Sequence, residues 1–249
     1  ILDAARAARG MPGADPRAMS HSWLFTGPPG SGRSLAALDF AAALMCTDPE
    51  EPGCGRCEAC QAVLDAKQHT DLVLVDPQEV IIPVDTVREV IGRAASLPTV
   101  APWRVVIFNN ADRLNNNGAN ALLKTVEEPP ARTVIIMCAP SDAPEDFSQT
   151  LRSRCRHLYI PSPSVESITA QLVSEGASDH DAHLAALTSL RHVGRARRLV
   201  NDPAVQKRRA VAINLAEEVF HGSQGFQAVT SLLKLVDSEA KAVSYTHLR

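Results

Sequence analysis

The chain has 249 residues, of which 45% are hydrophobic but only 4% aromatic, so we expect a core filled mainly by aliphatic side chains. The formal net charge of −3 argues against a protein that coats nucleic acid over its whole surface. No apolar run approaches the ~20 residues needed to span a bilayer and no secretory signal is visible, so we expect a cytoplasmic protein without membrane contact.

Strand-like stretches alternate with helical patterns between residues 22 and 160. Each strand candidate is short, rich in β-branched or large apolar residues, and bounded by turn formers. The runs show little polar alternation, which indicates strands buried on both faces in a parallel sheet covered by helices. The predicted strands are Trp23–Thr26, Leu72–Val75, Arg104–Phe108, Thr133–Cys138 and His157–Ile160.

Helices are predicted between these strands. Arg33–Met45 follows the first strand, and Val84–Ala95 opens after Pro83, a residue type favoured at helix starts. A third helix is indicated by apolar residues that recur at i, i+3, i+4 and i+7 and so share one face. These residues are Ala119, Leu122, Leu123 and Val126.

The pattern changes after residue 160. The segment 161–164 is typical of a linker, and Ser164 is a candidate N-cap. No strand pattern follows, and helices are predicted near 165–174, 180–190, 194–201, 204–221 and 224–236. We therefore expect a large domain over 1–161, a small helical domain over 162–202, and a truncated helical domain over 203–249 that ends in a non-native tail.

A glycine-rich loop follows the first predicted strand and opens a helix, which is the context that a phosphate-binding loop requires. Gly27, Gly30 and Gly32 let backbone N–H groups surround a phosphate, and the helix N-terminus favours anions. The pattern G-x-x-x-x-G-K-[ST] has one departure, because Arg33 stands before Ser34 in place of lysine. A guanidinium is longer and forked, so it meets phosphate in another geometry. ATP or ADP binding and an empty glycine turn both stay open.

The second element of phosphate chemistry is an apolar strand that ends in acids, which hold Mg²⁺ and orient the attacking water. Here the strand ends at Asn109 and Asn110. Asparagine carries no negative charge, is a poor Mg²⁺ ligand and cannot take a proton. Asp112 lies further on and reads as a solvated residue at a helix start. The loss of the lysine and of the acids predicts that this chain does not hydrolyse ATP by itself.

Four cysteines, Cys46, Cys54, Cys57 and Cys60, form the pattern C-x7-C-x2-C-x2-C between the first helix and the second strand. Four thiolates close a tetrahedral Zn²⁺ site with no open position, which makes such a site structural. An iron–sulfur cluster is the competing ligand, and reduced cysteines without a metal are the third interpretation. We expect zinc, in a module over residues 46–60.

These features together resemble the AAA+ clamp-loader subunits of bacterial DNA polymerase III. The most specific segments are residues 120–130, which read NALLKTVEEPP, and the Ser-Arg-Cys triplet at 153–155. The resemblance implies an α/β fold: an AAA+ P-loop domain with a parallel five-stranded sheet and a zinc module, a helical lid domain and a helical collar domain. The family's γ and τ ATPases keep the lysine and the acid pair, so this chain resembles the δ′ branch instead.

The resemblance also assigns a role to Arg154, which would act as an arginine finger on the ATP of an adjacent γ/τ subunit. It implies a hetero-pentamer with γ/τ and δ subunits that loads the β sliding clamp onto primer-template DNA. The family's nucleotide-sensing positions are altered here, at Ser141 and at Gly194. Three alternatives stay open: an active γ/τ-type ATPase, a module that binds ATP or ADP without catalysis in trans, and a zinc-dependent nucleic-acid binder.

Overall fold

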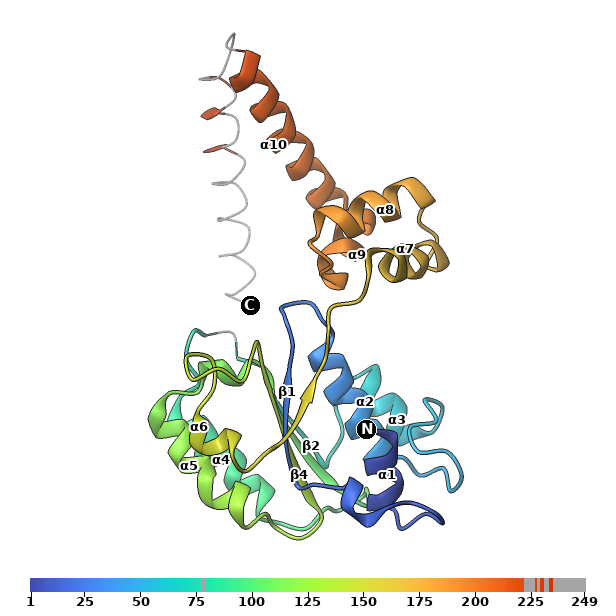
Figure 1. Ribbon diagram of the computed structural model, residues 1–249, viewed down its shortest axis with the longest axis vertical. Helices are drawn as coiled ribbons and strands as arrows, with labels where there is room; N and C mark the ends of the chain where they lie inside the picture. Colours follow the sequence, from blue (N-terminus) through green and yellow to red (C-terminus); the bar gives the residue numbers. More distant parts are fainter. Residues whose placement is uncertain (78, 222–226, 228, 231–232, 235–249) are drawn as a thin grey trace. The chain divides into compact units, whose positions relative to one another are not determined.

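The computed structural model describes residues 1–77, 79–221, 227, 229–230 and 233–234 (Figure 1). The chain divides into two compact units, Ile1–Ser162 and Pro163–Arg249. The predicted helix over 224–236 and the predicted tail fall mostly outside the described residues. The further division of residues 162–249 into a lid and a collar stays a prediction.

The first unit is built on a five-stranded sheet in which every pair of neighbours is parallel, as predicted. The strand order is β2-β3-β4-β1-β5, so the first strand in the chain lies inside the sheet and the last lies at its edge. The strands are β1 (Ser22–Thr26), β2 (Leu72–Val75), β3 (Arg104–Phe108), β4 (Thr133–Ala139) and β5 (Arg156–Tyr159).

Helices cover both faces of this sheet (Figure 1). One face carries α1 (Leu2–Ala8), α2 (Arg33–Met45) and α3 (Glu58–Leu64). The other carries α4 (Val84–Ala94), α5 (Asn116–Glu127) and α6 (Gln149–Arg152). Two short 3₁₀ turns, η1 (Pro16–Ala18) and η2 (Ala111–Arg113), complete the unit.

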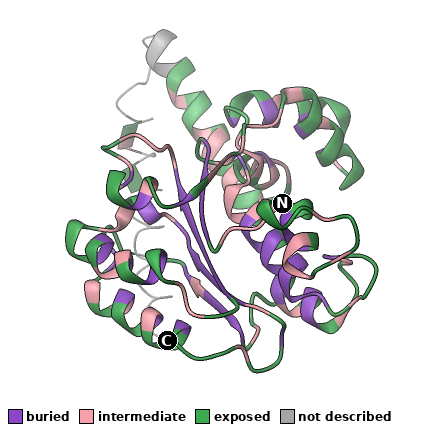
Figure 2. Cartoon of the chain, turned by 60° about the horizontal axis from the view of Figure 1, so that its bottom comes forward, coloured by how far each residue is buried: buried purple, intermediate pink, exposed green. Residues whose placement is uncertain are grey.

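Each face of the sheet has its own hydrophobic layer, and the buried strands run between the two (Figure 2). Neighbouring residues of β1 serve opposite layers: Phe25 packs toward α2, and Leu24 packs toward α4 and α5. The expectation of burial on both faces holds for β1, β3 and β4. It is wrong for β5, where Tyr159 is 60% exposed, because an edge strand has a neighbour on one side only.

A buried ion pair fastens the start of the sheet. Asp71, fully buried, accepts hydrogen bonds from the backbone N–H groups of Thr99, Val100 and Ala101 and from the Arg104 guanidinium at 2.9 Å. Arg104 also donates to the carbonyl of Ser96 at 3.0 Å. The pair therefore pins the loop between α4 and β3 from inside. The pKa of Asp71 is held well below its usual value, because these N–H and Arg104 hydrogen bonds outweigh the effect of burial.

The described part of the second unit is helical. Its helices are α7 (Val165–Ser174), α8 (Asp179–Thr188), α9 (Val193–Asn201) and α10 (Pro203–His221), and the first three of them form a small core. Ser164 caps α7 as predicted, because its hydroxyl accepts a hydrogen bond from the Ser167 N–H at 3.1 Å. Arg197 of α9 makes a bidentate ion pair with Glu175 at the end of α7. Within the described residues, no helix is both long and apolar enough to cross a membrane.

Candidate functional site

The glycine-rich loop joins the carboxyl end of β1 to the N-terminus of α2, as the sequence predicts. Gly30 and Gly32 have φ angles of 85° and 93°, a left-handed conformation that glycine adopts at little cost. Gly27 is required for another reason: a Cβ there would lie 2.2 Å from the carbonyl oxygen of Ile160. The loop thus has the curved backbone of a phosphate loop, closed on one side by the chain that follows β5.

The Arg33 side chain folds back onto this loop. Its Nη1 donates a hydrogen bond to the carbonyl oxygen of Gly27 at 2.6 Å, and its Nε is buried without a hydrogen-bond partner. The Arg33 carbonyl lies 3.9 Å from the thiol of Cys138, whose pKa is raised to about 12 by burial. Arg33 therefore holds the loop together from within, in addition to offering positive charge to a ligand.

The loop has hydrogen-bond donors that are still available to a ligand. Ser31 is 8% exposed, and its hydroxyl has no hydrogen-bond partner. The Arg33 Nε–H is a second buried donor without a partner, and the first N–H groups of α2 are oriented as at any helix start. Donors with no acidic neighbour in the loop suit an anion, so these residues fit a phosphate group. Ser34, at the place where P-loops carry a Mg²⁺ ligand, lies in the first turn of α2.

The carboxyl end of β3 carries amides in the place where ATP hydrolysis needs acids. Asn109 is 8% exposed, and its side-chain oxygen is buried without a hydrogen-bond partner. Asn110 has a φ of 53°, a left-handed conformation that asparagine tolerates. Asp112 is exposed on η2, as predicted for a solvated residue. No carboxylate is therefore supplied at the strand end itself.

Ser141 and Gly194, which the resemblance predicts to be altered sensing positions, have local contacts or solvent around them. The Ser141 hydroxyl, just beyond β4, donates to a carboxylate oxygen of Asp146 at 2.6 Å. Gly194 lies in the first turn of α9 and has no side chain to offer, and its neighbour Arg195 is exposed.

The four cysteines converge although they come from different segments. Cys46 follows the last residue of α2, Cys54 lies in the next loop, and Cys57 and Cys60 begin α3. All four sulfur atoms lie within 4.8 Å of one another. The Sγ of Cys46 is 3.7 Å from that of Cys54 and 3.9 Å from that of Cys57. A tetrahedron with Zn–S bonds of ~2.3 Å has edges of about 3.8 Å, so the cluster has the dimensions of a zinc site.

The backbone around the cysteines favours thiolates. The N–H groups of Cys57 and Cys60 point at the sulfurs of Cys54 and Cys57, at 3.4 and 3.5 Å. Burial opposes ionisation of Cys57, yet hydrogen bonds from Thr47 and Cys60 bring its pKa down to about 5. Burial raises the pKa of Cys60 instead, so a cation is needed to ionise the whole set. The cluster could bind zinc, and the turns at Gly53 and Gly55, with φ angles of 78° and 71°, let the chain wrap around it.

Arg154 lies at the surface between α6 and β5, with 37% of its side chain exposed. Its Nε donates to Glu127 at 2.5 Å, and its Nη1 donates to the carbonyl of Thr150 at 2.9 Å and to the hydroxyl of Ser153 at 3.1 Å. The residue is therefore accessible, but it is also held by its own chain.

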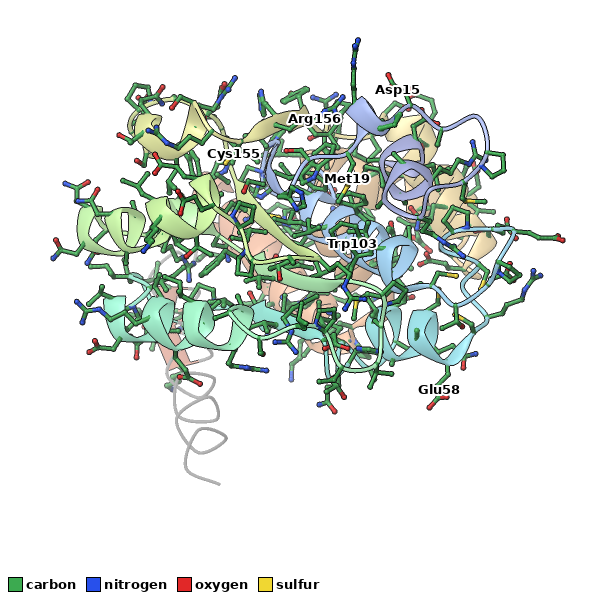
Figure 3. The ribbon with its side chains drawn as sticks, turned by 90° about the horizontal axis from the view of Figure 1, so that it is seen from below. Asp15, Met19, Glu58, Trp103, Cys155 and Arg156 are labelled. Carbon is green, nitrogen blue, oxygen red and sulfur yellow. The ribbon has the colours of Figure 1, made fainter. Side chains whose placement is uncertain are left out.

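The two neighbouring arginines have other partners. Arg152 donates to a carboxylate oxygen of Asp142 at 3.0 Å. Arg156 donates to the carbonyls of Arg17 and Ala18, at 2.8 and 2.7 Å, and stacks over the ring of Trp23. Figure 3 shows Arg156 beside the segment that carries Asp15 and Met19. Arg154 and Arg156 are both exposed, whereas Arg152 is half-buried.

Comparison with known proteins identifies the family. The family model described as "DNA polymerase III, delta subunit" matches residues 14–164, which is more than half of the chain. The chain belongs to this family. The predicted resemblance to the δ′ subunits of the clamp loader is confirmed by this match together with the sequence similarity to delta′ subunits.

Individual delta′ and gamma/tau subunits of DNA polymerase III are also similar to this chain in sequence. The chain is 36% identical to DNA polymerase III subunit delta′ of Pseudomonas aeruginosa over 165 residues, covering 64% of this chain and 49% of the relative. It is 35% identical to the delta′ subunit of Escherichia coli K12, covering 67% and 50%. The gamma/tau subunit of Mycobacterium tuberculosis H37Rv is 34% identical, covering 66% of this chain and 29% of that protein. The chain thus spans about half the length of the delta′ subunits that it matches.

Among solved structures, a gamma subunit-related protein of DNA polymerase III from Thermotoga maritima is similar in fold. The TM-score is 0.52 at 19% identity, over 87% of this chain and 72% of that one. This likeness concerns the fold alone.

Proposed function

We propose that this clamp-loader subunit does not hydrolyse ATP itself and acts on a neighbouring subunit instead. In this proposal it is the δ′ member of a pentamer with γ/τ and δ subunits. The pentamer opens the β sliding clamp and places it on primer-template DNA, in the cytoplasm. The chain contributes a fixed body to the ring and Arg154 to the ATP site of the adjacent γ/τ subunit.

One observation carries the first half of this proposal: Asn109 and Asn110 end β3 where catalysis needs carboxylates. A Mg²⁺ ion bound to nucleotide would meet neutral amides there, and no side chain at the strand end could orient and deprotonate water. The Arg33–Gly27 hydrogen bond adds to this, because the forked side chain is engaged in the loop itself. The rival function, a γ/τ-type ATPase, requires that hydrolysis proceed with Arg33 in place of lysine and with the asparagine pair in place of acids.

The test is ATP turnover by the isolated full-length subunit. We expect no activity above that of a Ser34→Ala preparation purified in parallel, because any ATPase common to both comes from contaminants. Turnover at a rate typical of motor ATPases, abolished by Ser34→Ala, would overturn the non-hydrolysing assignment.

The second half of the proposal is supported by the exposure of Arg154 on a surface segment with the Ser-Arg-Cys sequence. An arginine supplied in trans neutralises charge on the transferring phosphoryl group, and in GTPases it is worth ~10³–10⁵ in rate. In a complex reconstituted with γ/τ and δ, Arg154→Ala should reduce DNA-stimulated ATPase and clamp loading. Arg154→Lys should recover only part of the rate, because an ammonium lacks the fork. Unchanged rates with Arg154→Ala would remove the finger assignment.

A second candidate function is nucleotide binding for stability alone. The unpartnered donors of Ser31 and Arg33 favour it, since they await an anion. Thermal shift with ATP or ADP, each with and without Mg²⁺, separates the possibilities. Stabilisation that does not depend on Mg²⁺ would support a held nucleotide, because the amides at the end of β3 are poor Mg²⁺ ligands. No shift with any nucleotide would indicate an empty loop.

We also propose that the ion held by the cysteine cluster is structural zinc. The support is a set of four sulfur ligands with the dimensions of a tetrahedral site. The metal would join the end of α2 to α3 and so stabilise the insertion that follows the phosphate loop.

A further inference from the structure

The acid that holds Arg154 comes from a distant part of the chain. Glu127 is the last residue of α5, and 27 positions separate it from the arginine. Its Oε1 accepts a hydrogen bond from the Arg154 Nε at 2.5 Å, while the Thr150 carbonyl accepts one from Nη1. Two of the three guanidinium nitrogens are therefore fixed, from two different helices.

The third nitrogen is left for a ligand. Within the described part of the chain, the Arg154 Nη2 donates no hydrogen bond. A guanidinium has five N–H donors in one plane, so the bonds of Nε to Glu127 and of Nη1 to Thr150 and Ser153 set that plane and leave the Nη2 edge open. Phosphate oxygens are recognised by such an open edge.

The position of Glu127 in its helix indicates that helix stability is not the reason for the acid. The carbonyl end of a helix carries partial negative charge, so an acid in the last turn is unfavourable there. Glu128, the C-cap residue that follows, is exposed as well but has no side-chain hydrogen bond or ion pair among the described residues. Of these two neighbouring acids, Glu127 is the one that contacts Arg154.

We propose that Glu127 is a positioning residue that braces Arg154, so that the arginine reaches the neighbouring subunit's ATP already oriented. This inference rests on the proposed role of Arg154 as a finger in trans. An exposed arginine has many rotamers, and ordering it at the moment of reaction slows the step. A carboxylate that fixes Nε orders the side chain in advance, so less entropy is lost during the reaction, and the edge that faces the phosphate stays open.

The Glu127–Arg154 ion pair could either support the arginine during the reaction or hold it back, and the two roles predict opposite effects of removing Glu127 on the rate. If the ion pair had to break before Arg154 could act, removal of Glu127 would speed the reaction. Bracing requires the reverse, because the guanidinium keeps its Glu127 bond while the two N–H groups of Nη2 meet the phosphate. Exposed ion pairs contribute little, so the expected loss is about two- to fivefold.

The experiment uses the complex reconstituted from the full-length subunit with γ/τ and δ. The variants are Glu127→Gln, the matched control Glu128→Gln, Glu127→Asp, Arg154→Ala, and the double variant Glu127→Gln/Arg154→Ala. The measurements are kcat and KM for ATP in the presence of clamp and primed DNA, together with the melting temperature of each isolated subunit.

We expect Glu127→Gln to lower kcat about two- to fivefold with little change in KM, and Glu128→Gln to match the wild type. Glu127→Asp keeps the charge on a shorter side chain, so its kcat should lie between those of Glu127→Gln and the wild type. In the Arg154→Ala background, Glu127→Gln should have no further effect, which a general loss of structure could not produce.

The outcomes separate the inference from the function on which it rests. If Arg154→Ala is without effect, the finger itself is wrong. If Arg154→Ala lowers the rate and Glu127→Gln does not, or raises it, the finger stands and the brace is overturned. An equal loss from Glu127→Gln with and without Arg154 would likewise overturn the brace.

Discussion

At the scale of single residues, Asp71 and Arg104 show how much one buried pair can fix. Asp71→Asn keeps the shape but leaves the buried Arg104 guanidinium without its anion. Removing one partner of a buried pair typically costs about 3–5 kcal/mol, so a comparable loss in the free energy of unfolding is expected. Urea unfolding of the variant and the wild type at pH 7 measures it. A loss below about 1 kcal/mol would mean that water reaches the pair.

The same carboxylate gives a pH dependence with a defined sign. The pKa of Asp71 is lowered in the folded chain, so its contribution is fully present above the unfolded-state pKa of about 3.9. That contribution is lost as pH falls toward the lower folded-state pKa. The difference in unfolding free energy between wild type and Asp71→Asn should therefore shrink below about pH 4. A difference independent of pH would contradict the assignment.

Two glycines offer a matched contrast. In Gly27→Ala the added Cβ meets the Ile160 carbonyl oxygen at 2.2 Å, whereas in Gly92→Ala, on α4, nothing lies within 4 Å. Overpacking costs roughly 1–3 kcal/mol, while alanine in a helix gains roughly 0.5–1 kcal/mol over glycine. Thermal unfolding should thus show a lower melting temperature for Gly27→Ala and a slightly higher one for Gly92→Ala. Equal melting temperatures would show that the loop can shift to accept a methyl group.

At the scale of elements, the cysteine module is the piece that depends on a ligand. We expect about one zinc ion per chain and no visible absorption of the kind that iron–sulfur clusters give. Cys57→Ser should lose the metal and loosen α3, which Cys57 caps, and amide exchange in residues 46–64 should rise. Cys138→Ala, outside the cluster, should retain the zinc. Full zinc content in Cys57→Ser would contradict the ligand set.

The elements themselves were largely predictable from sequence. The ends of β2 and β3 and of α2 agree with prediction, because turn-forming or polar residues bound each apolar run. Helix α3 was missed, since its seven residues lie where spaced cysteines and glycines indicate only turns. Contacts between distant residues had no signal either: nothing in the sequence pairs Asp71 with Arg104, or Glu127 with Arg154. For Arg154 the sequence supplied the position but not its partner.

At the scale of the whole molecule, residues 1–162 form a unit with two core layers of their own. This unit contains the phosphate loop, the cysteine cluster and Arg154, so we expect a 1–162 fragment to fold alone. It should unfold cooperatively and hold about as much zinc as the full chain. Circular dichroism with metal analysis would check this, and a fragment without a cooperative transition would contradict it.

The hydrogen bond from Arg33 to the Gly27 carbonyl has a consequence for how such a subunit responds to its surroundings. A loop that is held by a hydrogen bond from its own side chain can keep its curvature without a bound nucleotide. Its geometry should then be the same in a starved cell as in a growing one. In the pentamer that we propose, a loop of constant geometry would give the neighbouring subunits a fixed reference.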